Sequence, residues 1–117
     1  MIRCKRVYEA PAGDDGYRVL VDRLWPRGMK KSDLRYDEWP KELAPSNELR
    51  KAFHGETIDF ATFSERYRQE LAQNLEAARA LARHGDSGTL TLLYGAKNTG
   101  QNHALVLADF LRHCRDQ

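Results

Sequence analysis

Two short runs of apolar residues in the first quarter of the chain predict β-strands. Residues 2–8 alternate between apolar and charged side chains until the pattern fails at Arg6. After a turn rich in glycine and aspartate, residues 17–24 carry the uninterrupted apolar run VLV at 19–21. A short run of this kind is typical of a strand that is covered on both faces. We therefore expect the second strand to lie at the centre of the sheet.

The middle of the chain contains two helix signals. Ser46 can cap a helix that ends at His54, because its hydroxyl can accept a backbone N–H of the first turn. From residue 60 to residue 84, apolar residues recur at intervals of three and four. They are Phe60, Phe63, Tyr67, Leu71, Leu75, Ala78 and Leu81. This spacing predicts one continuous helix, with Asp59 as its cap and Gly85 at its end.

The remaining segments predict a loop, a strand and a buried helix. Residues 29–45 are polar and contain two prolines, so we expect a partly ordered loop held by Tyr36, Trp39 and Leu43. Residues 89–94, TLTLLY, show the strongest strand pattern of the chain. The last segment, from about Asn102 to Arg115, is apolar on most sides and is expected to be a buried helix.

This order of elements predicts the α/β class. We expect a small two-layer or three-layer sandwich in which a short, mostly parallel sheet is flanked by helices. The length of 117 residues suits a single domain over residues 1–117. Because helices separate the second strand from the third, the two strands can pair in parallel. Their carboxyl ends then lie side by side, where open α/β sheets bind ligands.

Composition narrows the possible functions only slightly. The net charge of +2 is too small to predict a nucleic-acid partner, but residues 1–35 hold nine basic and five acidic side chains. This excess favours an anionic ligand or partner, and fits a solvated basic surface equally well. Cys4 and Cys114 stand alone at opposite ends of the chain, so no metal site is predicted. A charged N-terminus without a long apolar segment predicts a cytoplasmic protein with no membrane span.

The sequence VDRLWPRG at residues 21–28 contains charged and aromatic side chains that a turn does not require. Pro and Gly alone supply the backbone angles of a turn. Arg23 and Arg27 can grip a phosphate or carboxylate in a bidentate manner, or form surface ion pairs. Asp22 can serve ligand binding or catalysis, or accept backbone N–H groups of the next loop. Trp25 can stack on a ligand, although packing is the commoner role of a tryptophan.

A second polar segment, YGAKNTGQNH, follows the third strand and leads into the last helix. Its amides and the helix N-terminus can face an anion, with Lys97 as a compact charge and Asn98 and Asn102 as further ligand-binding candidates. His103 can be a hydrogen-bond acceptor or general base, or can simply hold the loop. Neither segment has the glycine pattern of a phosphate loop or a dinucleotide site, and no cofactor is predicted.

Three stretches of the chain together resemble the YeaO-like family, a branch of the bacterial domain-of-unknown-function family 488. They are DGYRVLVDRLWPRG, ELAPSNELRKAFH and TLTLLYGAKNTGQNHALVL, and the likeness covers nearly the whole chain. The resemblance implies a compact bacterial α/β domain without a defined activity, and Asp22 with Arg23 matches the family's pattern at the strand end. Longer members of the wider family tend to carry Cys-His-Arg where this chain has Asn102-His103-Ala104. The resemblance therefore implies a binding module rather than thiol chemistry.

Three hypotheses of function follow. The leading one is binding of a small anionic ligand, a phosphorylated metabolite or a nucleotide, with nucleic acid as a weaker alternative. The second is a weak hydrolase or transferase in which His103 is the base and Asp22 orients it, which requires the two side chains to lie within about 6 Å. The third is an interaction module in which Trp25 and Trp39 anchor a protein partner. The first two require segments distant in sequence to meet at one edge of the sheet.

Overall fold

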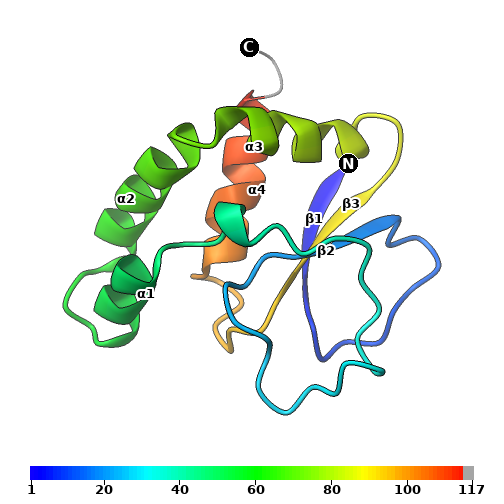
Figure 1. Ribbon diagram of the computed structural model, residues 1–117, viewed down its shortest axis with the longest axis horizontal. Coiled ribbons are helices and arrows are strands. Elements are labelled where there is room, and N and C mark those ends of the chain that lie inside the picture. The colour runs from blue at the N-terminus through cyan, green and yellow to red at the C-terminus, as the bar shows by residue number, and fades with distance from the viewer. Residues whose placement is uncertain (115–117) are drawn as a thin grey trace.

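The computed structural model describes residues 1–114 and contains a three-stranded sheet with helices on one of its faces (Figure 1). The strands are β1 (Ile2–Arg6), β2 (Tyr17–Leu20) and β3 (Leu90–Tyr94). β3 lies in the middle and pairs in parallel with both of its neighbours. The predicted α/β class and the parallel pairing of the second and third strands are confirmed.

β2 is an edge strand of this sheet, so the prediction that it lies at the centre is wrong. The VLV run at 19–21 is nevertheless fully buried. The open edge is closed by the loop, because the Leu20 N–H donates to the carbonyl of Glu38 at 3.0 Å and Val19 bridges to the same residue. A strand that is covered by a loop in this way has the composition of a central strand.

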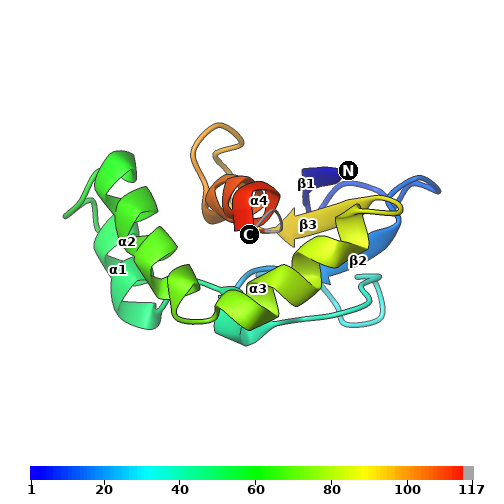
Figure 2. The same ribbon diagram turned by 90° about the horizontal axis from the view of Figure 1, so that it is seen from above.

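Four helices are present within residues 1–114, and two of them replace the single helix predicted over residues 60–84. The backbone leaves the helix at Gln73 and Asn74, whose N–H groups donate to the carbonyls of Glu70 and Leu71. The chain changes direction there (Figures 1 and 2). The apolar spacing continues across the break, which is why periodicity did not reveal it. The helices are α1 (Asn47–His54), α2 (Phe60–Ala72), α3 (Leu75–Ala82) and α4 (His103–Cys114).

The helix ends follow the predicted capping chemistry. The Ser46 hydroxyl accepts the N–H of Leu49 at the start of α1, and the Asp59 carboxylate accepts the N–H of Thr62 at the start of α2. Two 3-10 turns, η1 (Lys41–Leu43) and η2 (Arg83–Gly85), complete the regular structure of the described part of the chain. The predicted end of the last helix at Arg115 lies outside the described residues. No helix of the described chain is long and apolar enough to cross a membrane.

The two faces of the sheet are covered by different kinds of structure. One face, which includes Val19 and Leu92, joins a single core with buried residues of all four helices. Figure 2 shows α4 between the sheet and the pair formed by α1 and α2. The other face, which includes Leu20 and Leu93, is covered by apolar side chains of the 25–39 loop. The protein is therefore a two-layer sandwich of sheet and helices, with an irregular cover on the second face.

Candidate functional site

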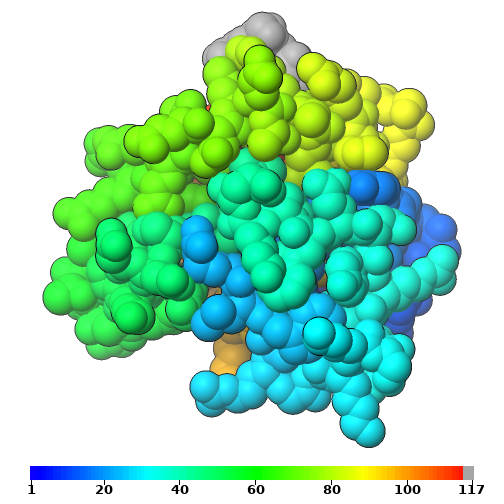
Figure 3. All heavy atoms as spheres, in the orientation of Figure 1, coloured from blue at the N-terminus to red at the C-terminus, as the bar shows by residue number. Residues whose placement is uncertain are grey.

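A cleft of about 1050 Å³ lies beyond the carboxyl ends of the strands and extends to α1 and α2. Figure 3 shows the surface indented between the green helices and the blue loop that follows β2. The predicted site residues all line this cleft: Asp22, Arg23, Trp25, Arg27, Lys97, Asn98, Asn102 and His103. The two segments predicted to meet at one edge of the sheet do so, while the roles assigned to these residues remain predictions.

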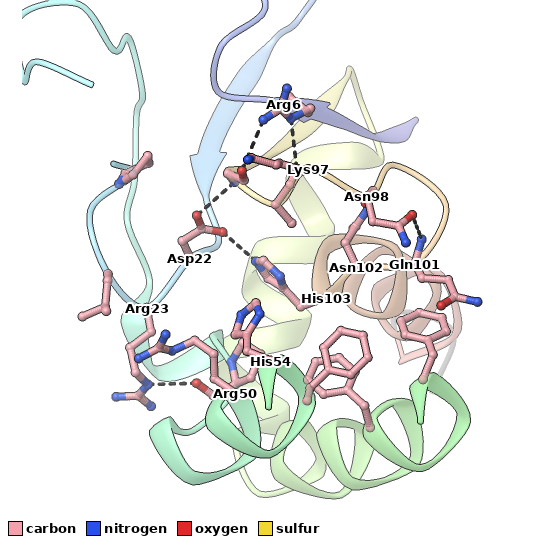
Figure 4. A pocket seen from close by; sticks show the side chains of 18 of the residues that line it. Arg6, Asp22, Arg23, Arg50, His54, Lys97, Asn98, Gln101, Asn102 and His103 are labelled. Atoms are coloured by element: carbon pink, nitrogen blue, oxygen red, sulfur yellow. Dashed lines mark hydrogen bonds and ion pairs between the residues drawn. The ribbon is translucent and has the colours of Figure 1, made fainter. Parts of the chain in front are cut away.

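Asp22 joins the two segments. β2 ends at Leu20 rather than at residue 24, so Asp22 lies beyond the strand, where its side chain reaches the end of β3. Its Oδ1 lies 2.6 Å from Nε2 of His103, and its Oδ2 accepts the N–H of Gly95 at 3.0 Å (Figure 4). The side chains of Asp22 and His103 are 16% and 17% exposed. Both carboxylate oxygens therefore help to hold the start of α4 against the end of β3.

The position next to this carboxylate requires glycine. A Cβ atom on Gly95 would lie 2.9 Å from Oδ2 of Asp22 and 3.7 Å from Cβ of Pro26. The first of these distances is shorter than any relaxed contact between a carbon and an oxygen atom, so a side chain here would displace the carboxylate. Gly95 thus lets the backbone approach Asp22 closely enough to donate its hydrogen bond.

The bond between Asp22 and His103 fixes which ring nitrogen faces other partners. An ionised carboxylate only accepts hydrogen bonds, so Nε2 of His103 carries the proton that is donated to Asp22. Nδ1 is then the ring nitrogen that remains for a ligand. The 2.6 Å separation also satisfies the geometric requirement of the second hypothesis, in which Asp22 orients His103 as a base.

Neither cysteine supplies a nucleophile to the cleft. Cys4 lies beneath α4, where its thiol donates to the carbonyl of Ala104 at 3.4 Å. Burial raises the pKa of this thiol to about 11, against an opposing effect of Arg112. Cys114 is buried at the other end of α4, and burial raises the pKa of its thiol as well. Across residues 1–114, no three His, Cys, Asp or Glu side chains gather in a way that could hold a metal ion.

Five cationic side chains line the cleft, and none of them forms an ion pair with a carboxylate within residues 1–114. Arg23 donates from Nε to the carbonyl of Pro45 at 2.9 Å, and Arg6 donates from Nε to the carbonyl of Ala96 at the same distance. These bonds position the guanidinium groups without neutralising them. The five are Arg6, Arg23, Arg27, Arg50 and Lys97.

Among the residues that the structure describes, three carboxylates also line the cleft, and two of them have other partners. Asp22 is bound by His103 and by the Gly95 N–H. Asp59 caps α2, and its hydrogen bonds with Thr62 lower its pKa below the ordinary value. The third is Glu56, which is exposed. The cleft therefore keeps an excess of positive charge, which attracts anions.

Both asparagines of the loop are used in its own structure. Asn102 is buried, with 1% exposed surface. Its Oδ1 accepts the N–H of Leu105 at the start of α4, and its Nδ2 donates to the carbonyl of Asn98. The side-chain oxygen of Asn98 accepts the N–H groups of Gly100 and Gln101. These contacts shape the loop that carries Lys97 and His103, and they support a structural role beside the predicted one.

The two tryptophans pack against each other rather than projecting from the surface. Their rings meet edge to face with centroids 5.6 Å apart, and both are half-buried. Nε1 of Trp25 donates to the carbonyl of Met29, and Nε1 of Trp39 donates to the carbonyl of Asp22. Both indole N–H groups are therefore satisfied within the loop, and Trp39 helps to position the backbone of Asp22. The third hypothesis gains no support from this arrangement.

Sequence reasoning missed the contribution of α1 and α2 to the cleft. Arg50, Phe53 and His54 lie on one side of α1, because residues three and four apart are neighbours on a helix. In Figure 4, Arg23, Arg50 and His54 gather on the same side of the cleft. Phe53 follows Leu49 by four residues on α1, but only Phe53 lines the cleft. The sequence did not reveal this position, because nothing local indicates where a helix docks.

Comparisons with known proteins agree with one another. The sequence profile of a family described as "Inactive DUF488-N3 subclade" matches residues 1–117. The chain is 64% identical over 111 residues to "Uncharacterized protein YeaO" of Escherichia coli K12, covering 95% of this chain and 96% of that protein. It is 41% identical over 110 residues to "Uncharacterized protein Rv3073c" of Mycobacterium tuberculosis and to "Uncharacterized protein Mb3100c" of Mycobacterium bovis. The match covers 94% of this chain and 92% of each relative. No solved structure matches the chain.

Proposed function

This chain belongs to the inactive DUF488-N3 subclade, as the YeaO-like resemblance of its sequence indicated, and from that premise we propose that it binds a small anionic ligand. The ligand is a phosphorylated metabolite or a nucleotide, and it occupies the cleft beyond the carboxyl ends of β2 and β3. The observation that carries this proposal is the group of five cations without a carboxylate partner in residues 1–114.

Cations that serve only the fold or solubility need not converge. Those of the cleft come from β1, from the loop after β2, from α1 and from the loop after β3. Their mutual repulsion is unfavourable in the unliganded protein and is relieved when an anion binds. Guanidinium groups also match the geometry of phosphate and carboxylate oxygens. An anionic ligand therefore explains why cations from four segments of the chain line one cleft.

The pair of Asp22 and His103 then acts as a structural clamp for the site. It ties the loop of Arg23 and Arg27 to the loop of Lys97, so the cations of both loops keep their relative positions. Loops that are fixed before binding lose less conformational entropy when the ligand arrives. This role agrees with the description of the subclade as inactive.

Isothermal titration with inorganic phosphate and a panel of phosphorylated metabolites tests the proposal. Wild type is compared with Arg27→Ala and with the matched control Lys31→Ala, a neighbouring exposed cation outside the cleft. Loss of one positive charge from the cleft is expected to weaken the binding of anions about threefold in Arg27→Ala. Lys31→Ala is expected to bind as wild type does. Absence of binding across the panel, or equal affinity of the three proteins, would refute the proposed function.

A weak hydrolase or transferase is a second candidate, favoured by the 2.6 Å contact between Asp22 and His103. In this scheme His103 activates a water molecule, because neither cysteine lies in the cleft. Incubation of wild type and His103→Gln with phosphorylated substrates, followed by ³¹P NMR, separates the two functions. Turnover that is lost in His103→Gln supports catalysis. Binding without turnover in both proteins supports the binding module.

A further inference from the structure

The cleft has a second chemical character that an anion alone does not explain. Its wall on the side of α1 and α2 is apolar and includes Phe53, Ile58, Phe60 and Phe63. A volume of about 1050 Å³ is much larger than a phosphate requires, and suits a ligand of the size of a nucleotide or larger. The ligand therefore has room for a substantial group beside its anionic end.

The aromatic wall is a stacked array. Phe53 and Phe63 lie with ring centroids 4.5 Å apart and planes inclined by 24°, and the centroid of Phe60 lies 5.8 Å from that of Phe53. Phe63 is buried, with 2% exposed surface, whereas Phe53 and Phe60 are half-buried. The array fastens α1 to α2, and the outer two rings keep exposed surface. Such surface can receive a flat, apolar ring by stacking.

Arg50 brings positive charge next to this wall. It lies three residues before Phe53 on α1, and both residues line the cleft. One terminal nitrogen of its guanidinium group donates to Oδ1 of Asn47 at 3.3 Å. Its Nε is buried and has no hydrogen-bond partner among residues 1–114. Arg50 lines the cleft, and within the described chain its terminal nitrogens make only the one long hydrogen bond to Asn47, so they remain for the oxygen atoms of a ligand.

We propose that the ligand is a nucleoside monophosphate or a compound of the same plan, in which one anionic phosphate is joined to one flat ring. This inference rests on the proposed function and specifies its ligand class. The phosphate lies between the guanidinium groups of Arg23 and Arg50, and the ring lies against Phe53 and Phe60. A sugar phosphate would leave the aromatic wall without a partner. An uncharged nucleoside would leave the cations without one.

Titration calorimetry with adenosine 5′-monophosphate, ribose 5-phosphate and adenosine tests this ligand class. Wild type is expected to bind adenosine 5′-monophosphate at least about tenfold more tightly than ribose 5-phosphate, because stacking on an aromatic side chain strengthens binding by roughly this factor. Phe60→Leu keeps an apolar contact between α1 and α2 and removes one outer ring. In this variant the advantage of the monophosphate over ribose 5-phosphate is expected to shrink, while ribose 5-phosphate binds unchanged.

Two further variants complete the design. Phe110→Leu removes a half-buried ring of α4 that does not line the cleft, and is expected to bind all three probes as wild type does. Arg50→Gln is expected to weaken both phosphates and to have little effect on adenosine. Thermal unfolding of each variant verifies that it is folded before titration.

The possible outcomes separate this inference from the function on which it rests. Equal affinity of wild type for adenosine 5′-monophosphate and ribose 5-phosphate refutes the ring subsite and leaves anion binding intact. Retention of the full advantage in Phe60→Leu also refutes the ring subsite. No binding of either phosphate refutes this ligand class, and no binding across the wider panel of phosphorylated metabolites refutes the proposed function itself. A selective loss in Phe60→Leu, with Phe110→Leu unchanged, supports the ligand class.

Discussion

Two groups of cationic side chains surround this small sheet, and they are arranged in opposite ways. On the loop-covered face, three cations converge on the carboxylate of Asp15, which is 1% exposed. Arg3 lies 2.7 Å from it, Lys5 lies 3.2 Å from it, and Arg18 is in direct contact. At the carboxyl edge of the sheet, five cations line the cleft without a carboxylate partner in residues 1–114.

The presence of a carboxylate partner distinguishes cations that stabilise the fold from cations that are available to bind a ligand. Burial disfavours the charged form of Asp15, but the N–H of Ala12 and the three cations together lower its pKa below the ordinary value. Arg18, which is 4% exposed, depends on that carboxylate for its charge balance. The cleft cations are not neutralised by a carboxylate of the described chain. Their mutual repulsion lowers the stability of the fold, and ligand binding can offset this loss.

The largest expected effect comes from breaking the paired group. Asp15→Asn leaves Arg18 buried beside a neutral side chain, and removing one partner of a buried ion pair costs about 3–5 kcal/mol. Equilibrium unfolding in urea, followed by circular dichroism, measures this loss. Asp14→Asn, at an exposed carboxylate that also contacts Arg3, is the matched control and should unfold near the wild-type midpoint. A small effect of Asp15→Asn would show that the buried group is not a stabilising one.

The same carboxylate predicts a dependence of stability on pH. Because folding lowers the pKa of Asp15, its contribution is fully present above the pKa of the unfolded chain, about 3.9, and is lost as the pH falls towards the folded pKa. The free energy of unfolding of wild type should therefore decrease below about pH 4. Carboxylates elsewhere contribute to both proteins, so Asp15→Asn should show a shallower decrease. Parallel curves for the two proteins would contradict the assignment.

An intermediate effect is expected at the clamp between the two loops. Gly95→Ala places a Cβ atom 2.9 Å from Oδ2 of Asp22, so the carboxylate must move and its bonds to Gly95 and His103 weaken. The expected loss of stability is about 1–3 kcal/mol, measured by urea unfolding. Gly88→Ala is the matched control, because a Cβ atom there meets nothing within 4 Å. The side-chain N–H signal of His103 in NMR spectra should shift only in Gly95→Ala.

The smallest effect on stability is expected for the cleft cations. Arg27→Ala and Lys97→Ala remove charges that have no carboxylate partner in the described chain, so the free energy of unfolding should change by less than about 0.5 kcal/mol. A slight gain in stability fits the account, because repulsion among the cations is reduced. A loss comparable with that of Asp15→Asn would place these side chains in the fold rather than in a binding site.

Much of the fold could be predicted because its determinants are local. The VLV run at 19–21 indicated its own burial, and Ser46 and Asp59 indicated the starts of α1 and α2. The order of the strands could not be predicted, since it depends on which edge the 37–39 segment covers. The break at residues 73–74 escaped notice because the apolar spacing of α2 continues into α3.

The candidate site also contains residues that the sequence could place and residues that it could not. Asp22 and His103 could be placed at one edge, because parallel strands on either side of helical segments end together. The contribution of Arg50 and Phe53 could not be predicted, because it depends on how α1 docks beside that edge. Asn102 was predicted to bind a ligand, and in the structure it caps α4, a role that asparagine commonly takes directly before a helix. Contacts made by docking are set by the whole core rather than by a local pattern.

The central claim is that the cleft cations are available to an anion, whereas those around Asp15 are not. The Nε–H signals of arginine side chains in a two-dimensional ¹H–¹⁵N NMR spectrum test it directly during titration with inorganic phosphate. The Nε–H of Arg50 and that of Arg23 should shift in a saturable manner, while that of Arg18 stays in place. Unmoved signals from the cleft, or equal shifts of all three arginines, would contradict the claim.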